Sequence, residues 1–274
     1  MVNYSCCLCN RPEVADDETD IVLRDANYWL QSIYDILLPR GGVEYSIILL
    51  PSLNALLLAM FFNDLSISGD ICNDYDTICD EVFTLSWWSA LYRPNIVQGD
   101  NYITVFSYAL HHANLPHILL NILMLNCTLA YLEKKYGVGR MLVQTLITAV
   151  GAALFGLWFY ADDIVFGFSG VSYGYMATII ADNILNYEHN RGRIWAMLLS
   201  AGIIVSIVLD YQFFTGVAAL AHVGGVTAGL CLGFLVLPTF CPRPWKRVFP
   251  IVSLVAILLH FVLLPCILFN VIHI

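Results

Sequence analysis

The chain has 274 residues, of which 59% are hydrophobic and only 12% are charged. Soluble domains carry about 25% charged residues, so this composition excludes an ordinary soluble protein and indicates a membrane protein. The formal net charge of −9 argues against a nucleic-acid-binding function, because that function needs a basic surface.

The apolar residues are grouped in blocks that could cross a bilayer as helices, each of which needs roughly 20 mainly apolar residues. Seven blocks approach or meet that length: Tyr45–Phe62, Pro116–Leu132, Val138–Tyr160, Phe168–Tyr187, Ile194–Leu209, Gly216–Leu237 and Val248–Asn270. The predicted fold class is therefore all-α, a polytopic membrane helix bundle over residues 45–270 after an N-terminal tail, residues 1–44. No apolar run lies near Met1, so a cleavable signal peptide is not expected.

The basic residues predict the orientation of these spans. Eleven of the twelve fall on one side of a seven-span topology: Arg11, Arg24, Arg40, Lys134, Lys135, Arg140, Arg191, Arg193, Arg243, Lys246 and Arg247. The twelfth, Arg93, falls on the other side. Because basic residues favour the cytoplasmic side, we expect a cytoplasmic N-terminus and an outer C-terminus.

One long outer loop, residues 63–115, separates the first two spans and is rich in tryptophan and tyrosine. These residues favour the water–lipid boundary, so we expect the loop to lie partly in the outer headgroup layer. Cys72 and Cys79 share this loop. The sequence leaves two alternatives open: the two cysteines form a disulfide, or they do not. The inner group Cys6, Cys7 and Cys9 lacks a nearby fourth ligand and makes a poor zinc site.

Small residues recur at helical spacing in two of the predicted spans. Gly225, Gly229 and Gly233 follow one another every fourth residue in the sixth span, and Gly170 and Gly174 do so in the fourth. This spacing lets two helix backbones approach closely. Plain helix packing explains it, and so does a need to bring side chains of the two helices together.

Polar side chains are rare within a bilayer and usually have a function there. Four of them are predicted at similar depth, near the outer ends of spans two, four and six: His117, Asn121, Ser169 and, about two turns into its span, His222. Taken singly, each could be a helix cap or an interhelical hydrogen-bonding group. Taken together, they indicate a site.

The residue types in this group fit nucleophilic catalysis. A serine hydroxyl is a weak nucleophile until a base such as neutral histidine takes its proton, and the tetrahedral intermediate then needs donors for its oxyanion. His117 and Asn121 stand four residues apart on one helix face and could be such donors, with the Ser169 amide. Tyr173 could support His222. No acidic residue is predicted at this depth, so we expect a Ser169–His222 dyad. The other histidines, His111, His189, His260 and His273, have no such companions.

Three stretches resemble motifs of the rhomboid family of intramembrane serine proteases: HHANLPHILLN (111–121), GFSGVSY (167–173) and AHVGGVTAG (221–229). The resemblance covers roughly residues 102–237. It implies a six-helix rhomboid-like core, to which a seventh C-terminal span is added here, as in the secretory-pathway type. Glu133 and Gly137 match a further family motif, in which Leu129 replaces a glycine. Phe168 stands where inactive relatives often have proline.

The resemblance implies a role for each matching residue. Ser169 would be the nucleophile and His222 the general base; His117, Asn121 and the Ser169 amide would form the oxyanion hole. The supporting residues would be His112, Tyr173, Gly167, Gly170, Gly225 and Gly229.

The implied substrates are single-pass transmembrane proteins, cut near their outer or lumenal end within the lipid bilayer of the Golgi, another secretory-pathway membrane or the plasma membrane. Neither a cofactor nor a metal ion is expected. A catalytically inactive relative that binds membrane clients and directs their traffic is the alternative. A transporter is disfavoured, because Asp182 is the only deep charge and no internal repeat is present.

Overall fold

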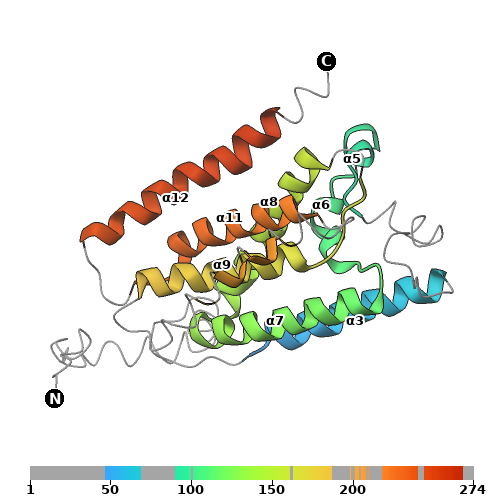
Figure 1. Cartoon of the computed structure of the whole chain (residues 1–274), viewed down its shortest axis with the longest axis horizontal. Helices are drawn as coiled ribbons and strands as arrows, with labels where there is room; N and C mark the ends of the chain where they lie inside the picture. Colours follow the sequence, from blue (N-terminus) through green and yellow to red (C-terminus); the bar gives the residue numbers. More distant parts are fainter. Residues whose placement is uncertain are drawn as a thin grey trace, which may run out of the picture.

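The computed structural model describes residues 47–68, 90–99, 101–160, 163–186, 218–239 and 244–267, and isolated positions between 198 and 209. Its helices are α3 (Leu49–Ser68), α5 (Arg93–Gly99), α6 (Thr104–Ser107), η1 (Tyr108–Leu110), α7 (Leu115–Tyr136), α8 (Val138–Phe159), α9 (Ser169–Leu185), α11 (Ala219–Val236), η2 (Pro244–Arg247) and α12 (Val248–Leu258), which continues into the π-helical turn η3 (Leu259–Leu263) (Figure 1). The cysteines at positions 6, 7, 9, 72 and 79 lie outside the described residues.

Five helical segments within the described residues are long and apolar enough to cross a membrane: Leu49–Ser66, Leu115–Tyr136, Val138–Phe159, Ala219–Val236 and Val248–Ile267. The helix α9 has 17 residues, about 26 Å at 1.5 Å per residue. The described residues of the predicted span at 194–209, namely 198, 201–203, 205–207 and 209, are helical. The prediction of an all-α, multi-pass membrane bundle is confirmed.

Several predicted boundaries were wrong by a few residues. The first span does not end at Phe62 but continues to Ser68, so the outer loop begins later than residue 63. The reason is that Asp64, which resembles a loop residue in the sequence, is buried and paired within the fold. The sixth span begins at Ala219 rather than Gly216, because Ala218 has non-helical backbone angles. His222 therefore lies in the first turn of α11, not two turns into it.

The helices α9 and α11 run parallel and in direct backbone contact. A Cβ added at Gly225 would overlap the carbonyl oxygen of Gly170, and one at Gly229 would overlap that of Gly174. Four residues further along, a Cβ at Gly233 would lie 2.8 Å from the Ala181 Cβ. The small residues that are repeated in the sequence therefore form one continuous seam, which sets the register between the two helices.

The helix α8 packs antiparallel against this pair and supplies hydrogen bonds in the middle of the bundle. Gln144 Nε2 donates to Thr178 Oγ1 at 2.6 Å and to the Gly229 carbonyl at 3.0 Å. Thr178 Oγ1 in turn donates to the Gly174 carbonyl of its own helix at 2.8 Å and to the Gly229 carbonyl of α11 at 3.2 Å. Such bonds satisfy polar groups that lipid could not satisfy, so they hold the three helices in one arrangement.

The remaining helices flank this centre. In Figure 1, α7 lies on one side of α9 with α3 beside it, and α12 lies on the far side of α11. His260 of the π-helical turn donates from Nε2 to the Gly151 carbonyl of α8 at 3.0 Å. This histidine, which has no companion in the sequence, therefore fixes the last helix to the bundle.

The end of the bundle away from Ser169 contains two buried carboxylates. Glu133 of α7 accepts hydrogen bonds from the backbone N–H groups of Ile48, Leu49 and Leu50 at 2.5–2.9 Å. These are unpaired donors at a helix N-terminus, where a carboxylate also complements the helix dipole. Glu133 therefore ties the start of α3 to α7.

Asp182 of α9 is the second buried carboxylate. It accepts from Tyr131 at 2.7 Å, from Lys135 at 2.6 Å and from Asn186 at 3.0 Å, and also from the Tyr136 hydroxyl. The deep charge seen in the sequence is thus neutralised by an ion pair and joins α7 to α9 at the end opposite Ser169.

The seam between α9 and α11 predicts a specific sensitivity to added volume. Gly225→Ala places a methyl group against the Gly170 backbone, which cannot rotate away, so the helices must separate. We expect a loss of about 1–3 kcal/mol in stability, measured as a lower thermal unfolding midpoint in detergent.

The matched control is Gly202→Ala, because a Cβ at Gly202 meets no atom within 4 Å. An unfolding midpoint for Gly225→Ala equal to that of Gly202→Ala would contradict the seam.

Candidate active site

The end of the bundle at which α7, α9 and α11 begin contains a sharp turn that leads directly into α9. Gly167 has a φ of +122°, a conformation that side-chain-bearing residues rarely adopt. A Cβ at Gly167 would lie 2.8 Å from His117 Nε2 and 3.9 Å from Ser169 Oγ. The glycine therefore allows both the turn and the close approach of the His117 ring, and it leaves Ser169 as the first residue of α9.

Ser169 and His222 meet across the seam between α9 and α11. Ser169 Oγ and His222 Nε2 lie 2.8 Å apart, within hydrogen-bond distance. His222 is buried, whereas Ser169 is partly exposed. The contact between Gly170 and Gly225 brings the two side chains within reach, since each glycine lies within three residues of one of them.

Tyr173, one turn after Ser169, lies against the imidazole. The rings of Tyr173 and His222 are stacked, with centroids 4.4 Å apart and an interplanar angle of 25°. The Tyr173 hydroxyl donates to Ser206 Oγ at 2.8 Å. The imidazole is therefore held on one side by a flat aromatic surface, as the four-residue spacing from Ser169 predicted.

His117 and Asn121 occupy the first two turns of α7. The Asn114 side chain caps this helix by accepting from the His117 backbone N–H at 2.9 Å, and Pro116 follows the cap. Asn121 is buried, and its Nδ2 donates to the His117 carbonyl at 2.9 Å. An amide nitrogen carries two N–H groups, so this bond uses only one of them.

His112 lies in the loop before α7 and contacts the same turn. The Phe168 N–H donates to His112 Nε2 over a long 3.5 Å, and the His112 and His117 rings meet edge to face at 5.0 Å. Burial, together with the neighbouring His117, lowers the pKa of His112 to about 3. A neutral imidazole is consistent with its acceptance of the Phe168 N–H.

Within the described part of the chain, two polar atoms around this turn are buried without a hydrogen-bond partner, Asn121 Oδ1 and Ser172 Oγ. Buried polar groups in native proteins are usually paired with protein or ordered water. Their clustering near Ser169 therefore makes this end of the bundle suited to holding water.

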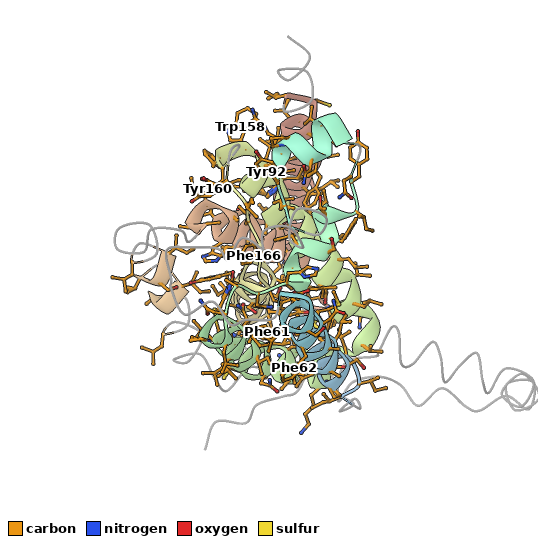
Figure 2. The ribbon with its side chains drawn as sticks, turned by 90° about the vertical axis from the view of Figure 1, so that its right-hand side faces the viewer. Phe61, Phe62, Tyr92, Trp158, Tyr160 and Phe166 are labelled. Atoms are coloured by element: carbon orange, nitrogen blue, oxygen red, sulfur yellow. The ribbon has the colours of Figure 1, made fainter. Side chains whose placement is uncertain are left out.

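Aromatic side chains surround the turn at this end of the bundle. Figure 2 views this end of the bundle, with Phe166 near its centre, Tyr92, Trp158 and Tyr160 on one side, and Phe61 and Phe62 on the other. The Phe166 ring lies 6.4 Å from that of His117. Backbone hydrogen bonds of 2.9 Å between Leu91 and Val165 fix the outer loop to the segment that leads into α9.

Two functional contacts were missed by the sequence analysis. His111, which appeared to have no companion, pairs through Nδ1 with Asp64 Oδ2 at 2.8 Å and fixes the loop before α7 to the end of α3. Ser206, the partner of Tyr173, was not singled out. Neither contact has a sequence signal, because each joins residues that are more than 30 positions apart.

The predicted site residues thus fall into two groups. Ser169, His222, His117, Asn121, His112 and Tyr173 converge on the turn before α9, together with Gly167. Gly170, Gly225 and Gly229 lie in the helix seam, where they determine spacing. In the described part of the chain, no three histidine, cysteine, aspartate or glutamate side chains form a metal-binding group.

Comparisons with known proteins all lead to one family of proteins. The Rhomboid domain family matches residues 99–239, which include the turn and both helices of the seam. The chain is 29% identical over 154 residues to RHOMBOID-like protein 6, mitochondrial, of Arabidopsis thaliana, covering 56% of this chain and 50% of that protein. It is 26% identical over 154 residues to RHOMBOID-like protein 4 of the same plant, covering 56% and 39%.

A further relative is Rhomboid-like protease 5 of Toxoplasma gondii, which is 26% identical over 140 residues, covering 50% of this chain and 16% of that protein. The chain spans half or less of the length of these relatives. The family match covers more than half of the chain and includes every residue that converges on the turn before α9, so this protein belongs to the rhomboid family.

Proposed function

We propose that this protein is an intramembrane serine endopeptidase that cleaves transmembrane helices. The observation that carries the proposal is the 2.8 Å contact between Ser169 Oγ and His222 Nε2, at the end of a membrane bundle where α7, α9 and α11 begin. A serine in hydrogen-bond reach of a histidine that is itself oriented by a third group is the arrangement of an activated nucleophile. Here the third group is the stacked Tyr173 ring.

The proposed reaction is acyl transfer to serine followed by hydrolysis. Ser169 Oγ attacks the carbonyl carbon of the scissile peptide bond while His222 Nε2 accepts the hydroxyl proton. The tetrahedral intermediate collapses, the C–N bond breaks, and His222 gives the proton to the departing amine. Water then attacks the acyl ester, His222 accepts its proton, and the Ser169 hydroxyl is regenerated as the acid product leaves.

The developing oxyanion needs donors that are already in place. The Ser169 backbone N–H is free of an i−4 partner, because Ser169 begins a helix. The His117 ring lies against Gly167, and Asn121, with its remaining N–H, follows one turn later on the same face of α7. Fixed donors of this kind are worth roughly 3–4 kcal/mol each in the barrier.

The proposed substrates are single-pass membrane proteins. The site lies within the first two turns of three helices, so it would meet a substrate helix near one membrane surface. A substrate helix would approach laterally between α7 and the segment at 194–209, and its end must unwind to expose a peptide bond. With the distribution of basic residues described above, that surface is the lumenal or outer one, in the Golgi, another secretory-pathway membrane or the plasma membrane.

Removal of the proposed nucleophile tests the assignment directly. With purified protein in liposomes and a labelled single-pass substrate, we expect Ser169→Ala to abolish cleavage and labelling by a fluorophosphonate probe, because no other group replaces the attacking oxygen. Gel analysis of the products and of the labelled enzyme gives both readouts.

The matched control is Ser253→Ala, a buried serine in α12 remote from the turn. Cleavage by Ser169→Ala at the wild-type rate would overturn the assignment. A wild-type protein that retains a bound single-pass client without cutting it would instead identify an inactive relative.

The depth of the site also predicts where the cut falls. Because Ser169 is at the start of α9, we expect product masses to place the cleaved bond in the outer half of the substrate span. Mass spectrometry of both fragments measures this position. A cut in the cytoplasmic half would contradict the proposed orientation.

The oxyanion role predicts a loss of rate at Asn121. We expect Asn121→Ala to lower kcat about 100-fold with little change in KM, because the lost donor acts mainly on the transition state. Asn126→Ala is a close control: Asn126 also lies on α7 and also donates to the carbonyl four residues earlier, at 2.7 Å, but it is exposed and bonds to Asn54 of α3. Equal kcat values for the two variants would refute the role of Asn121.

A further inference from the structure

Ser206 makes a contact that the proposed reaction does not yet use. It lies among described helical residues at 205–207, in the predicted fifth span. Its hydroxyl donates to the Ile203 carbonyl at 3.0 Å and accepts from the Tyr173 hydroxyl at 2.8 Å. A serine hydroxyl has one proton and two lone pairs, so the first bond determines the direction of the second: Tyr173 donates and Ser206 accepts.

This hydrogen bond is the outer part of a continuous series of contacts that reaches the nucleophile. The Tyr173 hydroxyl is fixed by Ser206, and the Tyr173 ring is stacked at 4.4 Å on the His222 ring. His222 Nε2 lies 2.8 Å from Ser169 Oγ. A tyrosine side chain rotates about its Cα–Cβ bond. A hydrogen bond that fixes the hydroxyl at the far end of the ring limits this rotation, and so limits the orientation of the ring on which the imidazole is stacked.

The restriction affects the reaction through geometry. Proton transfer from Ser169 requires the His222 lone pair to point at the hydroxyl, and small changes of angle reduce the fraction of productive encounters. Tyr173 and Ser206 lie on different spans, and 33 residues separate them in the chain. The orientation of the proposed base is therefore coupled to the position of the segment at 201–209.

We propose that Ser206 is a positioning residue for the hydrolysis, acting on His222 through Tyr173. This inference rests on the proposed function, because it concerns the same serine and histidine. Ser206 does not touch the reacting atoms. Its hydroxyl keeps the Tyr173 ring in the plane that directs the imidazole toward Ser169.

A merely local role for the bond makes a different prediction. If the bond only packs the segment at 201–209 against α9, its loss would lower stability or change how substrates reach the site. The reactivity of Ser169 toward a small probe would then be unchanged. The rate of covalent labelling by a fluorophosphonate separates the two cases, because a small reagent does not require a transmembrane helix to enter.

The experiment compares the full-length protein with Ser206→Ala, Tyr173→Phe and the double variant. Tyr173→Phe keeps the stacked ring and removes only the hydroxyl, so it tests the same bond from the other end even where Ser206→Ala lowers the folded yield. A hydrogen bond of ordinary strength predicts a labelling rate about threefold to tenfold lower in each single variant. The double variant should be no slower than the slower single one.

Two further variants complete the test. Ser206→Thr keeps the hydroxyl and is expected to restore labelling to near the wild-type rate. Ser52→Ala removes a serine of α3 that donates to the Ile48 carbonyl at 2.8 Å, at the end of the bundle away from Ser169, and it should label as the wild type does. With a transmembrane substrate, Ser206→Ala should lower kcat by the same factor as labelling and leave KM unchanged.

The outcomes distinguish this inference from the proposed function. Absence of cleavage and labelling in the wild type defeats the proposed function itself. Wild-type activity with unchanged labelling in Ser206→Ala overturns the role of Ser206 alone. Losses that multiply in the double variant would also overturn it, because they show that the two hydroxyls act independently.

Discussion

The seam between α9 and α11 is the constraint on which the rest of the structure depends. Serine and histidine side chains are short, so they meet only where their helix backbones are nearly in contact. Gly170 faces Gly225, and Gly174 faces Gly229, with no space for a side chain between them. In lipid no hydrophobic driving force holds helices together, so this contact rests on close packing and on hydrogen bonds such as those from Gln144 and Thr178 to the Gly229 carbonyl.

Polar groups are distributed along the bundle according to what they do. Glu133 and Asp182, at the end away from Ser169, are surrounded by N–H and O–H donors and by a lysine, so they tie helices together. The turn before α9 is different. Among the described residues, Asn121 Oδ1 and Ser172 Oγ are buried there without a hydrogen-bond partner, and that arrangement is suited to water and to a reacting oxygen rather than to rigidity.

The proposed base rests on an aromatic ring. In a serine–histidine–aspartate triad the carboxylate sets the imidazole through a hydrogen bond, which would place a negative charge near the membrane interior. Here the Tyr173 ring provides a flat surface, and Ser206 holds that ring from another span. An uncharged support of this kind avoids the desolvation of a carboxylate in a low-dielectric site.

The sequence alone identified a membrane protein, its apolar blocks and the polar residues of the candidate site. It could do so because the length of an apolar block and the cost of a polar group in lipid are properties of local composition. The four-residue spacing of Ser169 and Tyr173, and of the glycines, likewise depends only on helix periodicity. The sequence could not place the end of α3 at Ser68, the pairing of Asp64 with His111, the hydrogen bond from Tyr173 to Ser206 or the anchoring of α12 by His260. Each of these depends on which distant segments become neighbours, and that is decided only when the helices pack, since a buried polar group takes its partner from whichever helix lies against it.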